Sequence, residues 1–363
     1  MTELKTIDKN DVSNKTVVLR VDFNCPTKGG KVLNTYRIDR SLDTIQYLFN
    51  NGVKKIVILT HLGRPEGKFK KSLSLLPIVK VFSSRMADFG LGDFNIKLLK
   101  YKKDIGECVA EANKIKKRVT FLPNIRFWKE EVGNNENFSK KLAELGEIFV
   151  NDAFSVSHRL HASVVGISKY LPSYAGFLLE TEVIKIEKAI KHPASPAIAV
   201  IGGVKLETKI PILKSLAKSY DKILVGGLIA VALQEKSPEV KDLLKHFSPG
   251  KIVFPLGFRD KEKRDISEEA AKEFAKIIAS AKTILWNGPL GKFEEAPFDK
   301  GSKIVGEAIA KSKAYKLAGG GETSAMLKIF RIFDKIDFVS TGGGAMLKLI
   351  GEGELPGIKI LRK

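Results

Sequence analysis

The chain is poor in cysteine and has no long hydrophobic run. Its 363 residues include only two cysteines, Cys25 and Cys108. Two thiols are too few for a disulfide framework or a thiolate metal site. No apolar run approaches the roughly 18–20 residues that span a bilayer, so we expect no membrane partner. The first twelve residues, MTELKTIDKNDV, are polar and mixed in charge, which predicts neither a signal nor a transit peptide and favours a cytoplasmic protein.

Acidic residues are also scarce relative to basic ones. There are 62 lysines and arginines against 41 aspartates and glutamates, a net charge of +21. Such a surplus occurs in proteins that bind nucleic acids, anionic membrane surfaces or small anionic substrates. Most of it is lysine scattered along the chain, as on a solvated surface. We expect no nucleic-acid partner, and a basic nucleic-acid-binding protein is kept only as an alternative.

Length and apolar pattern predict two α/β lobes. At roughly 150 residues per domain the chain has room for about two. Short, continuous apolar runs alternate with amphipathic helical stretches from end to end. Continuous runs indicate sheets buried on both faces, and the alternation predicts parallel strands with right-handed crossovers. The predicted strands are 16–21, 55–60, 119–123, 147–151, 197–201, 222–226, 251–255, 283–286, 315–318 and 337–340.

Two helical patterns are informative. Apolar residues at helical spacing in 38–48 predict a helix, and Gly52 stands where a C′ glycine would end it. Residues 178–191 form a charged amphipathic pattern followed by the breaker-rich HPASP. A helix that links two lobes fits this stretch better than a flexible linker, which would be rich in Gly and Ser.

Arginines and histidines follow the predicted strands of the first half. The carboxyl ends of parallel strands share one edge of the sheet, where ligands bind. The planar fork of arginine matches carboxylate or phosphate, so this edge predicts a site for a small, multiply anionic molecule. The histidines are expected to bind the anion or support the fold, because the nearby arginines would repel a metal ion. These residues are Asp22, Phe23, Asn24, Arg37, His61, Arg64, Arg126, His158, Arg159 and His161.

Glycine clusters follow the predicted strands of the second half. Such loops let backbone N–H groups approach phosphate oxygens at the start of a helix, although neither GxxxxGK[ST] nor GxGxxG is present. Nearby lysines would add mobile charge, and a carboxylate beside a glycine loop is a candidate Mg²⁺ ligand together with nucleotide phosphates. The features are Gly202–Gly203, Lys205, Lys209, Gly226–Gly227, Gly319–Gly321, Glu322, Thr323 and Gly342–Gly344. Asn287 and Glu294 follow a late strand, where polar groups can meet a ribose.

One lobe thus collects arginines and the other collects glycines and lysines. The economical inference is phosphoryl transfer from a nucleotide on the second lobe to an anionic acceptor on the first. That reaction needs positioning and charge neutralisation more than covalent chemistry.

The motifs, in order over nearly the whole chain, resemble those of the phosphoglycerate kinase family. They are RVDFNCP, RID, THLGRPEG, NIRFWKEE, VNDAFSVSHRLHAS, IGGVKLETKI, WNGPLGKFE, GGGET and STGGGA followed by LPG. The resemblance implies two doubly wound, Rossmann-like lobes (1–177 and 196–345), an interdomain helix (178–195) and a tail (346–363) that returns to the first lobe. It also implies reversible phosphoryl transfer between ATP and the carboxylate of 3-phosphoglycerate, giving ADP and 1,3-bisphosphoglycerate. Mg²⁺ would bind with the nucleotide, the lobes would close, and the protein would be a monomer.

The resemblance also implies a role for each matching residue. Arg37 would neutralise the phosphoryl group in flight, Lys205 would follow it, and Gly320 and Gly343 would complete the catalytic set. The phosphoglycerate would be bound by Asp22, Phe23, Asn24, Arg37, His61, Leu62, Gly63, Arg64, Arg126 and Arg159. The nucleotide would be bound by Gly203, Lys205, Lys209, Asn287, Glu294, Gly319, Gly320, Gly321, Glu322 and Thr323, with Glu322 as the metal ligand.

The sequence departs from the family pattern at several points. Pro123 replaces an acidic residue, Thr208 replaces an aspartate, and Glu322 replaces the aspartate after the triple glycine. The stretch 228–285 is short, and the usual landmarks there are reduced to FPLGFRDKEKRDIS. Part of that stretch encloses the adenine in the family, so we expect an open base pocket with weaker or broader nucleotide choice. A degenerate nucleotide-binding module without turnover is a further alternative.

Overall fold

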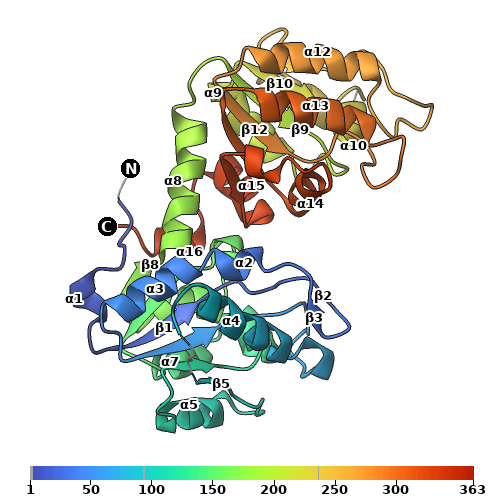
Figure 1. The fold of residues 1–363 in the computed structure, drawn as a ribbon. Coiled ribbons are helices and arrows are strands. Elements are labelled where there is room, and N and C mark those ends of the chain that lie inside the picture. The colour runs from blue at the N-terminus through green and yellow to red at the C-terminus, as the bar shows by residue number, and fades with distance from the viewer. Residues whose placement is uncertain (1–2, 93–94, 236) are drawn as a thin grey trace. The chain divides into compact units, whose positions relative to one another are not determined.

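The computed structural model describes residues 3–92, 95–235 and 237–363, which form two compact units (Figure 1). Unit 1 consists of Met1–Glu182 together with Glu354–Lys363, and unit 2 of Val183–Gly353. Helix α8 (Phe177–Lys191) begins in unit 1 and ends in unit 2, where the sequence predicts a linking helix. A search of the described residues for a helix long and apolar enough to cross a membrane finds none.

Unit 1 contains a six-stranded parallel sheet with the strand order β5-β6-β4-β1-β7-β8. The chain moves outward on one side of β1 and then returns to its other side, so the topological switch point lies beside β1. The sequence did not predict β5, β8 or a small antiparallel hairpin. The strands are β1 (Thr16–Arg20), β4 (Lys55–Leu59), β5 (Ile96–Leu98), β6 (Val119–Phe121), β7 (Ile148–Asn151) and β8 (Ser173–Ala175), and the hairpin is β2 (Thr27–Lys28) with β3 (Lys31–Val32).

Both faces of this sheet are buried, because successive strand residues enter different apolar clusters. Val17 and Leu19 face α3 and α4, whereas Val18 faces α5 and α7. Helix α3 ends at Asn50, and Gly52 has φ +74°, as the sequence predicts. The helices are α1 (Lys9–Val12), α2 (Tyr36–Asp39), α3 (Leu42–Asn50), α4 (Leu76–Asp88), α5 (Ile105–Lys114), α6 (Lys129–Val132), α7 (Glu136–Ala143) and α16 (Pro356–Lys359); short 3-10 turns are Lys71–Leu73, Ile125–Phe127, Phe154–Val156 and Ile167–Lys169, and Ala162–Gly166 is a π-helical turn.

Unit 2 repeats the plan with the parallel order β11-β10-β9-β12-β13-β14, so its switch point lies between β9 and β12. Each of these six strands falls where an apolar run predicts one. They are β9 (Ala197–Ile201), β10 (Lys222–Val225), β11 (Ile252–Val253), β12 (Thr283–Asn287), β13 (Tyr315–Gly319) and β14 (Phe338–Ser340). The helices are α9 (Ile210–Ser219), α10 (Gly227–Ala232), α11 (Pro238–Leu244), α12 (Glu268–Ala279), α13 (Lys300–Lys311), α14 (Gly321–Ile329) and α15 (Gly343–Glu352), and Phe333–Lys335 is a 3-10 turn.

The C-terminal segment that belongs to unit 1 begins at Glu354, later than the boundary at 346 taken from the sequence. Residues 346–352 continue α15, whose apolar residues are buried in unit 2 and which packs against α9. From Glu354 onward the chain joins unit 1: Gly357 N donates to Ser157 O at 2.8 Å, and Lys363 N donates to Glu3 O at 2.9 Å.

Asp152, directly after β7, holds the start of α8. Its carboxylate is fully buried, and Oδ1 accepts hydrogen bonds from Leu178 N at 2.9 Å and Leu179 N at 3.3 Å. Burial raises the pKa of Asp152 to about 7, although these hydrogen bonds pull it down in part. The carboxylate therefore stabilises the free N–H groups of the helix but is costly to ionise there.

We predict that Asp152→Asn removes a pH-dependent loss of stability. The folded-state pKa lies above the value of about 3.9 for an unfolded aspartate, so the folded chain binds the extra proton and loses stability as pH rises from about 4 to about 7. Asparagine keeps an acceptor oxygen and does not ionise. In urea unfolding, the free energy of unfolding of the variant should rise relative to that of the wild type as pH increases, by as much as about 4 kcal/mol. The exposed Asp43→Asn should show no such gain, and a pH-independent difference at Asp152 would contradict this assignment.

Candidate active site

Asp22, the second residue after β1, is the centre of a charged cluster in unit 1. Its side chain is 8% exposed, and Oδ2 accepts hydrogen bonds from Arg37 Nη1 at 2.5 Å and from Ser155 Oγ. His61 Nδ1 lies 3.6 Å from Oδ1. Burial alone would raise the pKa of Asp22, but the surrounding cations, Arg37 above all, hold it well below its ordinary value. Asp22 is therefore an ionised anchor for cations and does not exchange protons near neutral pH.

The loops that follow β1 and β4 are tied together at this edge. Asn24 Oδ1 accepts from Gly63 N at 2.8 Å, and Arg126 Nη1 donates to Gly63 O at 3.0 Å. The buried Asn124 side chain donates to Leu62 O at 2.7 Å. Gly63 has φ +61°, a left-handed conformation that favours glycine. The main chain of the loop after β4 is thus held by Asn24, Asn124 and Arg126.

Guanidinium groups crowd this edge without enough acceptors. Burial lowers the pKa of Arg126, and the charges of Arg20 and Arg159 lower it further, to about 10. The Nε atoms of Arg126 and Arg159 are buried and find no hydrogen-bond partner among the described residues. A buried donor without an acceptor is costly, and an anion with several oxygens supplies the missing acceptors. The cluster therefore has the chemistry of an anion site.

The other residues predicted for this edge differ in what they can offer a ligand. The Arg37 side chain is 30% exposed and Arg64 is exposed, so both can reach a ligand from solvent. Phe23 and Leu62 have buried side chains, and the Phe23 ring centroid lies 5.5 Å from that of Phe82 in the core. Only the main chain of Phe23 and Leu62 can contact a ligand.

Two residues of the cluster, Arg20 and Ser155, were not predicted from the sequence. Arg20, the last residue of β1, is fully buried beside His61, with Nη2 3.3 Å from His61 Nδ1. Its one sequence signal is an arginine inside the otherwise apolar run 16–21. Ser155, which donates to Asp22, has no signal of its own, because serine is common in turns.

In unit 2 the glycine loops bring main chains together at the carboxyl edge of the sheet. A Cβ on Gly343 would lie 2.5 Å from Gly320 Cα, and a Cβ on Gly202 would collide with Pro289 O. Gly320 also has φ +116°, which side-chain-bearing residues rarely adopt. These contacts join the starts of α14 and α15, where free N–H groups carry partial positive charge.

Lys209 is buried among residues predicted for the nucleotide. Its Nζ donates to Asn287 Oδ1, and Asn287 Nδ2 donates to Gly319 O at 2.5 Å. Burial lowers the pKa of Lys209 to about 8, and the charge of Glu322 opposes this. Asn287 thus orients a lysine and joins two strand ends. Lys205 is exposed, and Thr208 Oγ1 donates to Lys205 O at 2.8 Å.

A pocket of about 360 Å³ lies beside these groups in unit 2. Exposed Val204 and Leu228 give it apolar walls suited to a flat ring. The lining residues are Gly203, Val204, Gly227, Leu228, Glu262, Lys263, Arg264, Pro289, Gly291, Lys292, Phe293, Glu294 and Glu322. The pocket therefore unites Gly203, Glu294 and Glu322 of the predicted set with four residues of the stretch 228–285, namely Leu228, Glu262, Lys263 and Arg264.

The shortened stretch supplies a wall that the sequence analysis did not predict. The Arg264 guanidinium lies 3.9 Å from the Phe298 ring centroid and pairs with Asp260 at 2.5 Å. Asp265 Oδ2 accepts from Gly301 N at 2.8 Å, and burial raises the pKa of Asp265 to about 7. Lys292 N donates to Arg264 O at 2.8 Å. The stretch is thus fastened to the loop that carries Glu294.

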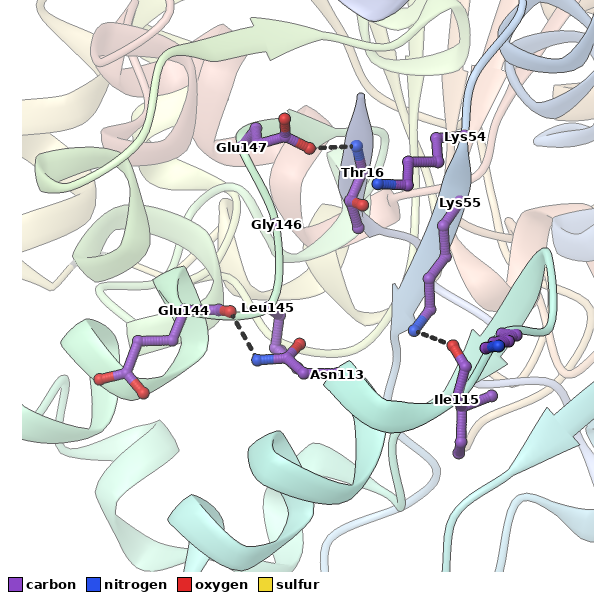
Figure 2. A pocket seen from close by; sticks show the side chains of 10 residues that line it. Thr16, Lys54, Lys55, Asn113, Ile115, Glu144, Leu145, Gly146 and Glu147 are labelled. Carbon is purple, nitrogen blue, oxygen red and sulfur yellow. Dashed lines mark hydrogen bonds between the residues drawn. The ribbon is translucent and has the colours of Figure 1, made fainter. Parts of the chain in front are cut away.

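A second pocket, of about 460 Å³, lies at the opposite, amino-terminal edge of the unit 1 sheet (Figure 2). Two of its charged side chains, Lys55 and Glu147, are already bonded within the protein. Lys55 Nζ donates to Ala112 O at 2.6 Å and Ile115 O at 2.9 Å, and Glu147 accepts from Thr16 N at 2.6 Å. The carboxyl-terminal edges, with their unpartnered guanidinium atoms and glycine loops, are the better candidate site.

The fold and these two edges are typical of a class of protein, the α/β phosphotransferases: unit 1 has a cluster of guanidinium groups, and unit 2 has glycine turns at helix starts. The family model described as phosphoglycerate kinase matches residues 7–244 and 253–354. The phosphoglycerate kinase of Borreliella afzelii is 38% identical over 99% of this chain and 100% of its own length, and that of Finegoldia magna 36% identical over 98% of each. The structure of phosphoglycerate kinase from Coxiella burnetii has a TM-score of 0.84 and 33% identity, covering 99% of both chains, and that from Pyrococcus horikoshii OT3 a TM-score of 0.83 and 29% identity, covering 99% of this chain and 98% of its own.

The chain belongs to the phosphoglycerate kinase family. Its activity is phosphoryl transfer between ATP and a carboxylate acceptor, 3-phosphoglycerate, which confirms the reaction predicted from the motifs. The two doubly wound lobes are confirmed as well.

We predict that Gly343→Ala weakens nucleotide binding and unit 2 stability, whereas Gly344→Ala does not. The added methyl group at 343 meets the main chain of Gly320, which cannot retreat without opening the two glycine turns. A methyl group at 344 meets nothing within 4 Å, although both residues lie in the first turn of α15. Calorimetric titration with ADP and thermal unfolding should separate the two variants, and equal behaviour would show that the close contact does not matter.

Proposed function

We propose that unit 1 binds 3-phosphoglycerate and unit 2 binds ATP or ADP, and that the γ-phosphoryl group passes between them in line. The bond between the γ-phosphorus and its bridging oxygen breaks as a bond to the acceptor carboxylate forms, and ADP keeps the bridging electron pair. A carboxylate is ionised at neutral pH, so the attack needs no general base. The low pKa of Asp22 agrees with this, because the carboxylate nearest the cluster is no proton acceptor.

The observation that carries the acceptor site is the pair of buried guanidinium donors without partners. Arg126 and Arg159 each hold a buried Nε with no acceptor in the described chain. The phosphate and carboxylate of phosphoglycerate would supply these acceptors, and the exposed Arg64 would add a third guanidinium. Arg37, anchored by Asp22, would place its charge beside the transferring group.

On unit 2, Lys205 and Lys209 would act differently. The buried Lys209 is held by Asn287 and would meet the nucleotide phosphates from a fixed position. The exposed Lys205 side chain would move with the phosphoryl group and stabilise the negative charge that develops on that group during transfer. The amides of Gly319–Gly321 and of Gly342–Gly344 would complete the phosphate cradle, and Glu294 would contact the ribose.

Mg²⁺ would bind with the nucleotide, with Glu322 as its protein ligand. No group of three or more His, Cys, Asp or Glu suited to a metal occurs among the described residues, and Glu322 lines the nucleotide pocket. One carboxylate suits Mg²⁺, which keeps several waters and takes further oxygens from phosphates. When bound, the ion would neutralise charge on the phosphate oxygens. Glu322 also lies near enough to Lys209 to raise that lysine's pKa, which keeps the lysine charged beside the phosphates.

Because the two sites lie on different units, we further propose that the units close on each other during turnover and exclude water. We propose that the protein works as a cytoplasmic monomer on its two small substrates. Size-exclusion chromatography with light scattering tests the monomer.

We predict that Lys205→Ala lowers kcat by at least about 100-fold, the cost of removing one charge donor to the transition state. The assay follows NADH oxidation by a coupled dehydrogenase with ATP, Mg²⁺ and 3-phosphoglycerate. Lys218→Ala, which removes an exposed lysine at the far end of α9, is the matched control and should retain full activity. A near-normal rate for Lys205→Ala would remove it from the mechanism.

The same assay tests the proposal as a whole. Arg37→Ala should abolish most of the activity, because it removes a charge from the acceptor site. ADP binding without turnover in the wild type would instead indicate a module that binds nucleotide only. Running ATP and GTP side by side would test whether the wall at 262–264 permits broader nucleotide choice.

A further inference from the structure

A buried series of polar side chains runs behind the charged cluster of unit 1. Glu131 in α6 is fully buried; Oε2 accepts from Ser163 N at 2.9 Å, and Oε1 accepts from the Ser163 hydroxyl at 2.6 Å. Ser163 Oγ in turn accepts from Arg20 Nε at 2.8 Å. The single hydroxyl proton of serine is used on Glu131, so the oxygen presents only lone pairs to Arg20. The direction of each hydrogen bond is therefore determined.

The series reaches His61 through Arg20. Both side chains are buried, and Arg20 Nη2 lies 3.3 Å from His61 Nδ1. A guanidinium only donates, so Nδ1 must be the acceptor and carries no proton. The proton of a neutral imidazole then resides on Nε2. Burial lowers the pKa of His61 well below its ordinary value; Asp22 opposes this and the nearby guanidiniums reinforce it.

Glu131 also supplies charge that Arg20 needs. Burial lowers the pKa of Arg20, whereas Glu131 and then Asp22 raise it. Burial alone would raise the pKa of Glu131, but His161, Arg20 and Ser163 bring it below its ordinary value, so Glu131 is ionised. His161 Nδ1 lies 3.6 Å from Glu131 Oε1, an ion-pair distance without a hydrogen bond. Removal of Glu131 would leave Arg20 dependent on Asp22, which already holds Arg37.

We propose that Glu131 is a positioning residue for the acceptor site: through Ser163 and Arg20 it holds His61 as the Nε2–H tautomer, a donor for the bound anion. The inference rests on the proposed function, because that anion is the phosphoglycerate of unit 1. The sequence alone gives no such role to Glu131, which lies in the charged run KEE and reads as surface.

Two variants interrupt the series at different points. Glu131→Gln removes the charge and leaves one acceptor oxygen where Ser163 N and the Ser163 hydroxyl each use one. Ser163→Ala removes the link but leaves the carboxylate. Ser139→Ala is the matched control, because its buried hydroxyl donates only to Asn135 O, within its own helix end. We expect both series variants to raise the KM for 3-phosphoglycerate roughly tenfold, the scale on which a lost orienting partner weakens a ligand-binding histidine.

Three readouts separate positioning from a general structural role. The KM for ATP should not change, because the nucleotide site lies on the other unit. Glu131→Asp should recover most of the phosphoglycerate affinity, since it restores the charge. Nitrogen NMR of labelled histidine, with the His61 signal assigned by its absence from His61→Asn, should show unprotonated Nδ1 in the wild type and in Ser139→Ala, and a mixture of tautomers in Ser163→Ala.

The outcomes are distinguishable. If Glu131→Gln does not fold, Ser163→Ala decides alone. An unchanged phosphoglycerate KM and an unchanged His61 tautomer in Ser163→Ala would overturn the proposal, as would an equal rise in the KM values for both substrates. If Arg37→Ala also leaves the phosphoglycerate KM unchanged, the acceptor site itself has been misplaced. If Arg37→Ala raises the KM for phosphoglycerate and the Glu131 and Ser163 variants do not, the acceptor site is supported and the role of Glu131 is wrong.

Discussion

The local structure of unit 1 depends on one constraint: positively charged arginine side chains are buried at the carboxyl edge of its sheet. Arg20 is fully buried, and a buried guanidinium is tolerated only with nearby anions and complete hydrogen bonding. Asp22 and Glu131 supply the charge on two sides, and main-chain carbonyls take further donors. Arg126 and Arg159 remain partly without acceptors. An anion bound at this edge would therefore stabilise the unit, because it would complete hydrogen bonds that folding leaves open.

Unit 2 presents positive charge at its carboxyl edge by a different physical means. Its carboxyl edge depends on main chains that approach too closely for any side chain, as between Gly320 and Gly343. Amide N–H groups at helix starts offer fixed partial charges, which bind phosphate without the desolvation cost of a buried cation. Lys209 is the buried exception, and Asn287 and Glu322 both stabilise its charge. Unit 1 thus presents full charges at its carboxyl edge, and unit 2 presents mainly oriented main-chain dipoles.

Residues of the stretch 228–285 form one wall of the unit 2 pocket. Glu262, Lys263 and Arg264 line the unit 2 pocket. Lys292 N donates to Arg264 O, which ties them to the loop of Glu294, and Asp265 accepts from Gly301 N in α13. The family match resumes at residue 253, just before this wall. A base bound in this pocket would contact charged side chains on the 262–264 wall and the apolar side chains of Val204 and Leu228.

Sequence patterns predicted most of the fold because local and global preferences agree. Continuous apolar runs mark ten of the strands, but β5 and β8 at the sheet edges were missed, since edge strands are short and only partly apolar. The predicted arginines of unit 1 and the glycines of unit 2 gather at their strand ends because parallel strands share one edge. The roles of Phe23 and Leu62 were less accessible, because only packing shows that their side chains enter the core.

The sequence by itself determined the fold class and, through its motifs, the reaction, because strand periodicity and strand-end motifs are local features. Only the tertiary structure decided which polar groups become buried partners. Glu131, Ser163 and Arg20 are far apart along the chain, and nothing in their neighbours indicates that they touch. Hydrogen-bond direction, and with it the proton position on His61, depends on three-dimensional contact between residues that no sequence spacing relates.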